Sequence, residues 1–227
     1  MALSSIIPFL TELKENNQRD WFALRKNDVA QLQGEFSAFI QQVIDGIAFF
    51  DQELKGVDAK NCVFRLYRDI RFSPDKTPYK THFAAYMAAG GRKSPRAGYY
   101  LHIEPNDCFI SGGIYCPEKD ILKALRKTIH ENIDEWEEVV QKTETFFPER
   151  YGDRDKLKKV PAGFSPDDPA TDWLKYKHYI FSRSLDDHFY AQHDIVPTVV
   201  SMFQHAVEMN RFINFVIDEL SHDQASF

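Results

Sequence analysis

The sequence predicts an α+β fold, in which an antiparallel β-meander of about four to five strands carries N- and C-terminal helices packed on one face. Apolar residues recur at helical spacing near both ends of the chain. The middle instead holds short segments rich in aromatic and β-branched residues. Short connections rich in proline, glycine and aspartate separate these segments, which favours antiparallel neighbours.

The N-terminal part of the chain predicts two helices. The serines at 4–5 can cap a short helix that has Pro8 in its first turn, and the asparagines at 16–17 end it. A longer helix is expected from about Asp20 onward, and Gly34 inside it is a place for a kink. Its apolar residues are Trp21, Val29, Leu32, Phe36, Phe39, Ile40, Val43, Ile44 and Ile47.

The middle of the chain predicts the strands, and the last part predicts more helices. Helices are expected after Pro117 and from about 194 to 220, with an irregular stretch at 148–169. Because strand side chains alternate between faces, one face of the sheet is expected to be apolar and the other polar. The expected strands are residues 63–68, 82–88, 99–104 and 108–115, with 179–184 as one more.

Composition and charge limit the class of protein. The chain has 227 residues and a formal net charge of −6, so general affinity for nucleic acid is not expected. Residues 60–98 nevertheless carry nine basic residues against two aspartates. The three cysteines form no CxxC pair, which indicates a reducing compartment, and the N-terminus does not resemble a signal peptide. We therefore expect a single domain over residues 1–227, cytoplasmic and without a membrane span.

Residues 65–80 are the most informative segment of the sequence. Four basic residues here, Arg65, Arg71, Lys76 and Lys80, are candidates for binding an anion such as phosphate or carboxylate. Two prolines in the segment would stiffen it and lower the cost of ordering it on binding. The alternative is a structural ion-pair network that holds a long loop to the sheet.

Three further residues of this segment are expected to be structural or orienting. In the predicted strand, Arg68 alternates onto the apolar face, so it is expected to be buried and paired. Asp69 and Asp75 are its candidate partners, and they are expected to orient the basic side chains rather than bind a metal.

The expected polar face of the sheet also carries catalytic candidates. His82, His102 and Glu104 share one face and could act as general acid and base, although hydrogen-bonded sheet side chains are the commoner alternative. We expect Arg65, Arg71, Lys80 and His82 to converge on one accessible site beside the small Ala84. No metal site is expected, because the spacing of His188 and His193 fits no known zinc pattern, and no cofactor is indicated.

Several of these segments resemble a known family. They are Asn17-x-Arg19-x-Trp21-Phe22, the run from Arg68 to Lys80, the run from Gly98 to Pro105, Gly112-Gly113-Ile114-Tyr115 and Val160-Pro161-x-Gly163-Phe164. Together they resemble the domain of unknown function 2461 family from about residue 6 to about residue 217. The resemblance implies a single domain and supplies no mechanism.

The function expected from these observations is binding of a phosphate-bearing small molecule through the Arg/Lys-rich strand-loop-strand motif, with a catalytic step left open. The alternative is a non-catalytic interaction module that docks an acidic protein or a nucleic-acid backbone. Nucleic acid is the less expected partner because the whole chain is acidic. The sequence indicates no oligomeric state.

Overall fold

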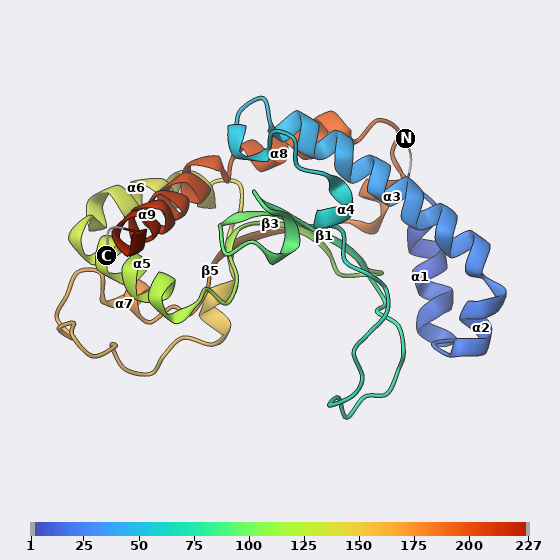
Figure 1. Ribbon diagram of the computed structural model, residues 1–227, viewed down its shortest axis with the longest axis horizontal. Coiled ribbons are helices and arrows are strands. Elements are labelled where there is room, and N and C mark those ends of the chain that lie inside the picture. The colour runs from blue at the N-terminus through green and yellow to red at the C-terminus, as the bar shows by residue number, and fades with distance from the viewer. Residues whose placement is uncertain (1–2, 226–227) are drawn as a thin grey trace. The chain divides into compact units, whose positions relative to one another are not determined.

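The computed structural model describes the backbone of residues 3–225 and the side chains through residue 222. It confirms the α+β fold class, with helices packed against a five-stranded antiparallel sheet (Figure 1). The order of the strands in the sheet is β1-β2-β3-β5-β4. The strands are β1 (Phe83–Met87), β2 (Gly98–Ile103), β3 (Cys108–Ile114), β4 (Glu149–Arg150) and β5 (Tyr179–Leu185). The predicted meander therefore holds for β1, β2 and β3, and β5 joins the sheet beside β3.

The contacts of the chain cluster into two compact units. The first comprises the chain through Arg92, with Tyr100–Ile110 and Ser184–Ser201, and the second comprises Lys93–Tyr99, Ser111–Arg183 and the chain from Met202 onward. Compact units defined by contacts need not fold independently, so the single domain stays a prediction.

The first unit is built around a long helix that packs on the sheet. It contains α1 (Ile6–Glu15), α2 (Arg19–Leu24), α3 (Lys26–Ile47), α4 (Ala59–Cys62) and β1. Phe36 of α3 meets Phe83 of β1 edge to face, with ring centroids 5.3 Å apart. The apolar side of α3 is buried, as its helical spacing predicts. The apolar face of β1 is thereby covered, which leaves its other face for polar side chains.

The second unit has a core of aromatic side chains. It contains α5 (Lys119–Glu131), α6 (Ile133–Glu144), α7 (Thr171–Leu174), β4, most of β5 and α9 (Val207–Ala225). Trp136 of α6 is fully buried and meets Trp173 and Tyr179 edge to face, at centroid distances of 5.6 and 5.5 Å. Such edge-to-face pairs stabilise a core beyond the apolar area that they bury.

Both long helices expected from the sequence are interrupted. The helix expected from Asp20 is α2 followed by α3, with Arg25 between them. At this break the Arg25 guanidinium pairs with Glu12 of α1 at 2.8 Å, a contact outside the expected helix, and lies over the ring of Trp21. The C-terminal helix is likewise α8 (Val196–Gln204) followed by α9. Ala206, at that break, faces Gly112, where an added Cβ would lie 2.4 Å from the Cβ of Ala206.

The first expected strand, residues 63–68, forms only isolated bridges. Val63 pairs with Ala85 and Tyr67 pairs with Tyr79. Between these bridges the chain advances four residues on one side and six on the other, so two extra residues bulge out near Thr81 and His82. The bulge interrupts the ladder, which is why the pattern of a strand does not become a regular strand here.

No helix in the described part of the chain is long and apolar enough to cross a membrane. The absence of a membrane span was predicted from the sequence.

Candidate functional site

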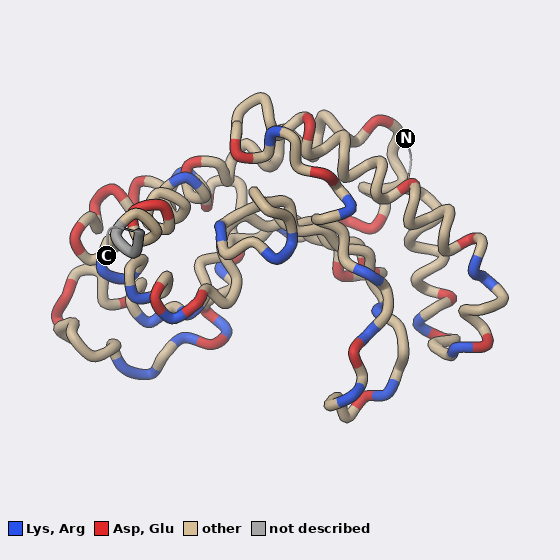
Figure 2. Tube along the Cα trace, in the orientation of Figure 1, with Lys and Arg blue, Asp and Glu red and all other residues tan. Residues whose placement is uncertain are grey.

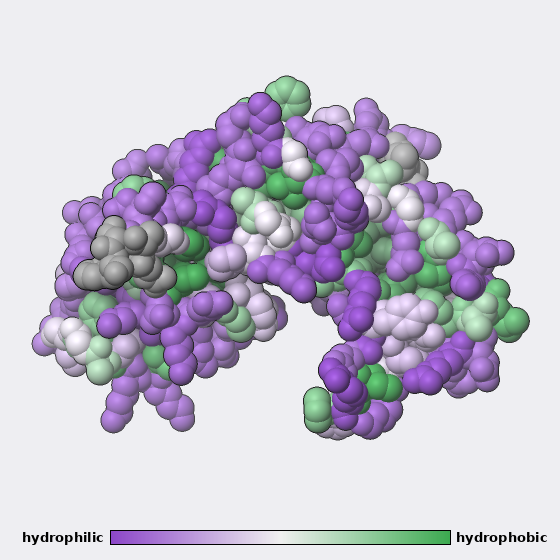
Figure 3. Space-filling view, viewed as in Figure 1, coloured by the Kyte–Doolittle hydropathy of each residue, from purple (hydrophilic) through white to green (hydrophobic). Residues whose placement is uncertain are grey.

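Residues 65–80 form an arm that projects from the sheet, which we call the charged hairpin (Figure 1). At its base Tyr67 bridges to Tyr79, and the Arg68 amide donates to the carbonyl of Pro78 at 2.9 Å. Basic residues and two aspartates are interspersed along it (Figure 2). Hydrophilic residues cover most of it (Figure 3), although the side chain of Phe72 is 92% exposed.

Arg68 is bonded within the charged hairpin. Its guanidinium pairs with Asp75 and donates to the hydroxyl and the carbonyl of Thr77. The Arg68 side chain is 26% exposed, so its burial is partial rather than complete. The Thr77 amide, Arg68 and the Thr77 hydroxyl donate to Asp75 and lower its pKa to about 2. Asp75 therefore serves as an internal acceptor for the hairpin.

Two of the predicted anion-binding residues are also engaged inside the hairpin. Arg71 donates to Asp69 through two parallel bonds, of 2.9 Å from Nε and 2.7 Å from Nη2. This pairing lowers the pKa of the Asp69 carboxyl. The Lys76 ammonium donates to the carbonyl of Ile70 at 3.1 Å.

Lys80 and Arg65 are placed differently, at the base of the hairpin. Among the described residues neither of them forms an ion pair. Partial burial, together with the charges of Arg65 and Arg92, lowers the pKa of the Lys80 ammonium. The Lys80 Nζ lies 5.0 Å from the ring centre of Phe64. The charges of Arg65 and Arg92 thus both act on Lys80, which has no carboxylate partner among the described residues. The charge of Arg65 also contributes to lowering the pKa of Asp69.

Arg92 is held in this position by neutral groups. It donates to the carbonyls of Lys60 and Asn61, at 3.0 and 2.9 Å, which anchors it to α4 without neutralising its charge. The neighbouring Gly91 has φ +76°, and a Cβ there would lie 2.5 Å from the Asn61 carbonyl oxygen. Only glycine permits this close approach.

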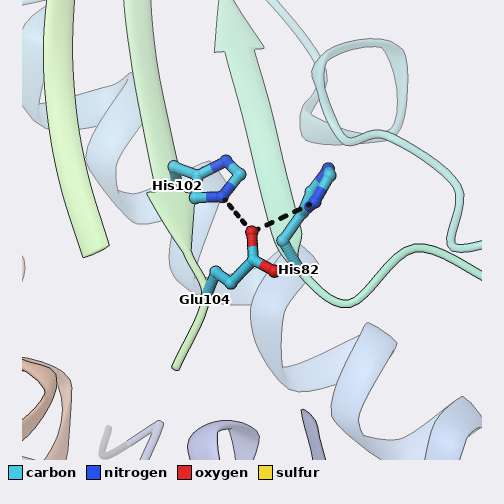
Figure 4. Close-up of side chains that lie close together, drawn as sticks. All are labelled: His82, His102 and Glu104. Carbon is cyan, nitrogen blue, oxygen red and sulfur yellow. Dashed lines mark hydrogen bonds and ion pairs between the residues drawn. The ribbon is translucent and has the colours of Figure 1, made fainter. Parts of the chain in front are cut away.

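The three catalytic candidates come together on the polar side of the sheet (Figure 4). His102 lies on β2, Glu104 follows that strand, and His82 immediately precedes β1. The Oε2 atom of Glu104 is 3.1 Å from Nε2 of His102 and 3.8 Å from Nδ1 of His82. The two imidazole rings are 4.4 Å apart. We call His82, His102 and Glu104 the histidine–glutamate cluster.

Neighbouring side chains fix the orientation of this cluster. The Thr81 hydroxyl donates to Oε1 of Glu104 at 2.6 Å, which leaves Oε2 for the two histidines. The Tyr100 hydroxyl lies 2.9 Å from Nδ1 of His102, and Phe109 stacks on the same imidazole at 4.7 Å. The bulge at residues 81–82 brings both Thr81 and His82 toward Glu104.

The cluster favours neutral histidines beside an anionic glutamate. Burial, with a smaller contribution from His102, lowers the pKa of His82 to about 4. Burial also lowers the pKa of His102, although its hydrogen bond to Glu104 opposes this. Burial alone would raise the pKa of Glu104, but bonds from Thr81 and His102 outweigh it and lower the pKa. At neutral pH the site therefore offers imidazole nitrogen lone pairs and a carboxylate.

The base of the charged hairpin is held by the N-terminal helices. The side-chain amide of Asn17 donates to the carbonyl of Tyr79 at 3.0 Å, and its oxygen accepts from the Tyr79 amide at 3.1 Å. Phe22 stacks on the Tyr79 ring with centroids 3.7 Å apart. These contacts position the residues that follow Tyr79 in sequence, among them Lys80 and His82.

Asn17→Ala is expected to destabilise the protein by about 2 kcal/mol, because it removes two hydrogen bonds and leaves the backbone of a buried tyrosine unpaired. Urea denaturation measures the loss. Gln18→Ala is the matched control, since Gln18 is exposed and its side chain makes no cap bond. Equal midpoints for the two variants would contradict this role of Asn17.

Several residues of the site were not among the sequence candidates. Thr81 and Tyr100 gave no signal beyond their position on or beside the predicted strands. Arg92 entered the sequence analysis only in the count of basic residues at 60–98. Its effect on the pKa of Lys80 depends on the fold. Asn17 and Phe22 were recognised as family motif residues, and the structure shows their partner to be Tyr79.

The fold and site define an α+β protein that presents a histidine–glutamate cluster near Lys80, a cation that forms no ion pair among the described residues. The chain belongs to the conserved hypothetical protein family DUF2461, which matches residues 5–212. The family recognised from the sequence motifs is therefore confirmed. The chain has no significant match among curated proteins or among solved structures.

Proposed function

We propose that the protein binds a phosphate-bearing small molecule on the polar side of the sheet, with Lys80, Arg65 and Arg92 as the anion-binding residues. The observation that carries this proposal is that Lys80 forms no ion pair among the described residues, although it experiences repulsion from Arg65 and Arg92. A bound phosphate relieves that repulsion and forms charge-assisted hydrogen bonds. Arg71 and Lys76 lie outside the proposed site, because Asp69 pairs with Arg71 and because Lys76 bonds to Ile70 in the hairpin, away from its base.

The position of the cations favours a small ligand. Lys80 is close enough to the histidine–glutamate cluster to lower the pKa of both imidazoles. A phosphate held there places the rest of its molecule near side chains able to exchange protons. We propose the cytoplasm as the compartment, since Cys62, Cys108 and Cys116 are all free.

Lys80→Gln is expected to weaken binding of a phosphorylated probe by about tenfold or more, because it removes a charged hydrogen-bond donor. Isothermal titration calorimetry with glycerol 3-phosphate measures the effect, and glycerol is the probe that lacks the phosphate. Lys76→Gln is the matched control on the same hairpin and should bind like the wild type. Equal loss in both variants, or equal binding of glycerol, would contradict the proposed site.

The alternative function is docking of a nucleic-acid backbone. The salt dependence of binding distinguishes it from binding of a small phosphorylated molecule. A single-stranded DNA oligonucleotide that bound more tightly than glycerol 3-phosphate, and lost affinity steeply with added salt, would favour the alternative. A compact phosphate site with few ionic contacts should respond more weakly to salt.

A further inference from the structure

We propose that the histidine–glutamate cluster binds a first-row transition-metal dication such as Zn²⁺, through one nitrogen each of His82 and His102 and a carboxylate oxygen of Glu104. This inference goes beyond the proposed anion site and does not depend on it. No local spacing motif reveals it, because His82 lies just before β1, whereas His102 lies on β2 and Glu104 just after that strand.

The spacing of the donor atoms carries the proposal. All three ligand atoms lie within 4.8 Å of one another. Donors bound to one metal at about 2.1 Å, at angles between tetrahedral and octahedral, lie about 3.0–3.4 Å apart. The distances from Glu104 Oε2 to the two histidines are already 3.1 and 3.8 Å. Small side-chain rotations therefore close the site around an ion.

The two side chains that must rotate are partly exposed. The side chains of His82 and Glu104 are 26% and 19% exposed, so each can move by a fraction of its length without disturbing the core. His102, at 8% exposure, is the fixed member against which the other two close. Their exposure also gives an ion a route from solvent.

The neighbours of the cluster match the outer shell of a metal site. Metal-bound histidines usually bond a second group through their other nitrogen, which fixes the ring. Tyr100 is placed to do this at Nδ1 of His102, with its oxygen as the acceptor once Nε2 binds the metal. Thr81 holds the second carboxylate oxygen of Glu104 at 2.6 Å. The carboxylate is thereby presented through one oxygen.

The donor set selects the class of ion. Two imidazoles and one carboxylate suit zinc, cobalt or ferrous iron, whereas Mg²⁺ and Ca²⁺ prefer a shell of oxygen atoms. Three protein donors also leave coordination positions open for water or a ligand oxygen. The nearby charge of Lys80 opposes a bare cation and favours an ion that carries an anionic ligand.

The test is metal titration of the full-length protein after treatment with a chelator. Calorimetry with Zn²⁺, and visible absorption with Co²⁺, should give one site per chain. His82→Gln and Glu104→Gln should each weaken binding by more than about 100-fold, and Tyr100→Phe by about 10–100-fold, the usual range for an outer-shell partner. Because His82 is partly exposed, its variant should stay folded, which circular dichroism checks.

His193→Gln is the matched control, since His193 is exposed and lies outside the cluster. It should bind Zn²⁺ like the wild type. The proposal is overturned if the wild-type protein binds neither Zn²⁺ nor Co²⁺, or if folded His82→Gln and Glu104→Gln bind as the wild type does. Loss of the site in His193→Gln, or Mg²⁺ binding as tight as Zn²⁺ binding, would also overturn it.

Discussion

Gly113→Ala is expected to destabilise the protein by at least about 4 kcal/mol, a loss reserved for severe backbone or core conflicts. Gly113 lies in β3 with φ +119°, a conformation that side chains with a Cβ rarely adopt. A Cβ there would lie 1.9 Å from the carbonyl oxygen of Tyr179 and 3.0 Å from its carbonyl carbon. Because both atoms belong to the backbone of β5, no side-chain rotation relieves the clash.

The same substitution elsewhere in the chain should have the opposite sign. Gly34 lies inside α3, and a Cβ added there meets no atom within 4 Å. Gly34→Ala should therefore stabilise the protein by roughly 0.5–1 kcal/mol through helix propensity. Thermal and urea denaturation of both variants measure the contrast. A Gly113→Ala variant as stable as the wild type would mean that β3 and β5 do not approach as described.

Lowering the pH from 7 to 4 is expected to cost about 3 kcal/mol of folding stability at His82 alone. Burial and the neighbouring His102 lower the pKa of His82 to about 4 in the folded protein, against about 6.5 in the unfolded chain. Between these values the unfolded chain binds a proton that the folded protein does not. Stability therefore falls as the pH drops through this window, and the contribution is constant above and below it.

His82→Gln should remove this part of the pH dependence. Urea denaturation at pH 7.5 and pH 4.5, with a chelator present to exclude metal ions, gives the difference in unfolding free energy for each variant. His193→Gln is the control, because His193 is exposed and should leave the wild-type dependence unchanged. The explanation is wrong if His82→Gln loses as much stability as the wild type between the two pH values.

The alternation of polar and apolar residues was enough to predict β1, β2, β3 and β5 and the polar side of the sheet, but not β4, and the strand expected at 63–68 is not regular. The expected strand at 99–104 corresponds to β2, and that at 108–115 to β3. The same parity put His82, His102 and Glu104 on one face, and the structure brings them together. These features are predictable because they depend on local side-chain alternation, which burial of one face then fixes.

Other features depend on partners that are distant in sequence or on local competition between charges. The break at Arg25 coincides with its ion pair to Glu12 of α1, a contact that no helical pattern contains. A count of charges placed Arg71 and Lys80 in one group of anion-binding candidates. In the structure, however, Arg71 is paired with Asp69, two residues away in sequence. The bulge near His82 could not be predicted from strand propensity. It reflects a change of register between the Val63–Ala85 and Tyr67–Tyr79 bridges.

The pairing of Asn17 with Tyr79 joins positions 62 residues apart. Closing so long a loop costs chain entropy that is repaid only when the N-terminal helices have formed and docked. The charged hairpin therefore does not gain its order by zipping up from its own turn, as an autonomous hairpin would. Its base is completed late in folding, and the Tyr79 amide should exchange its hydrogen with solvent only when the surrounding structure opens. Lys80 and His82 are thus positioned only as the whole protein folds, so the proposed binding surface and the folded state appear and disappear together.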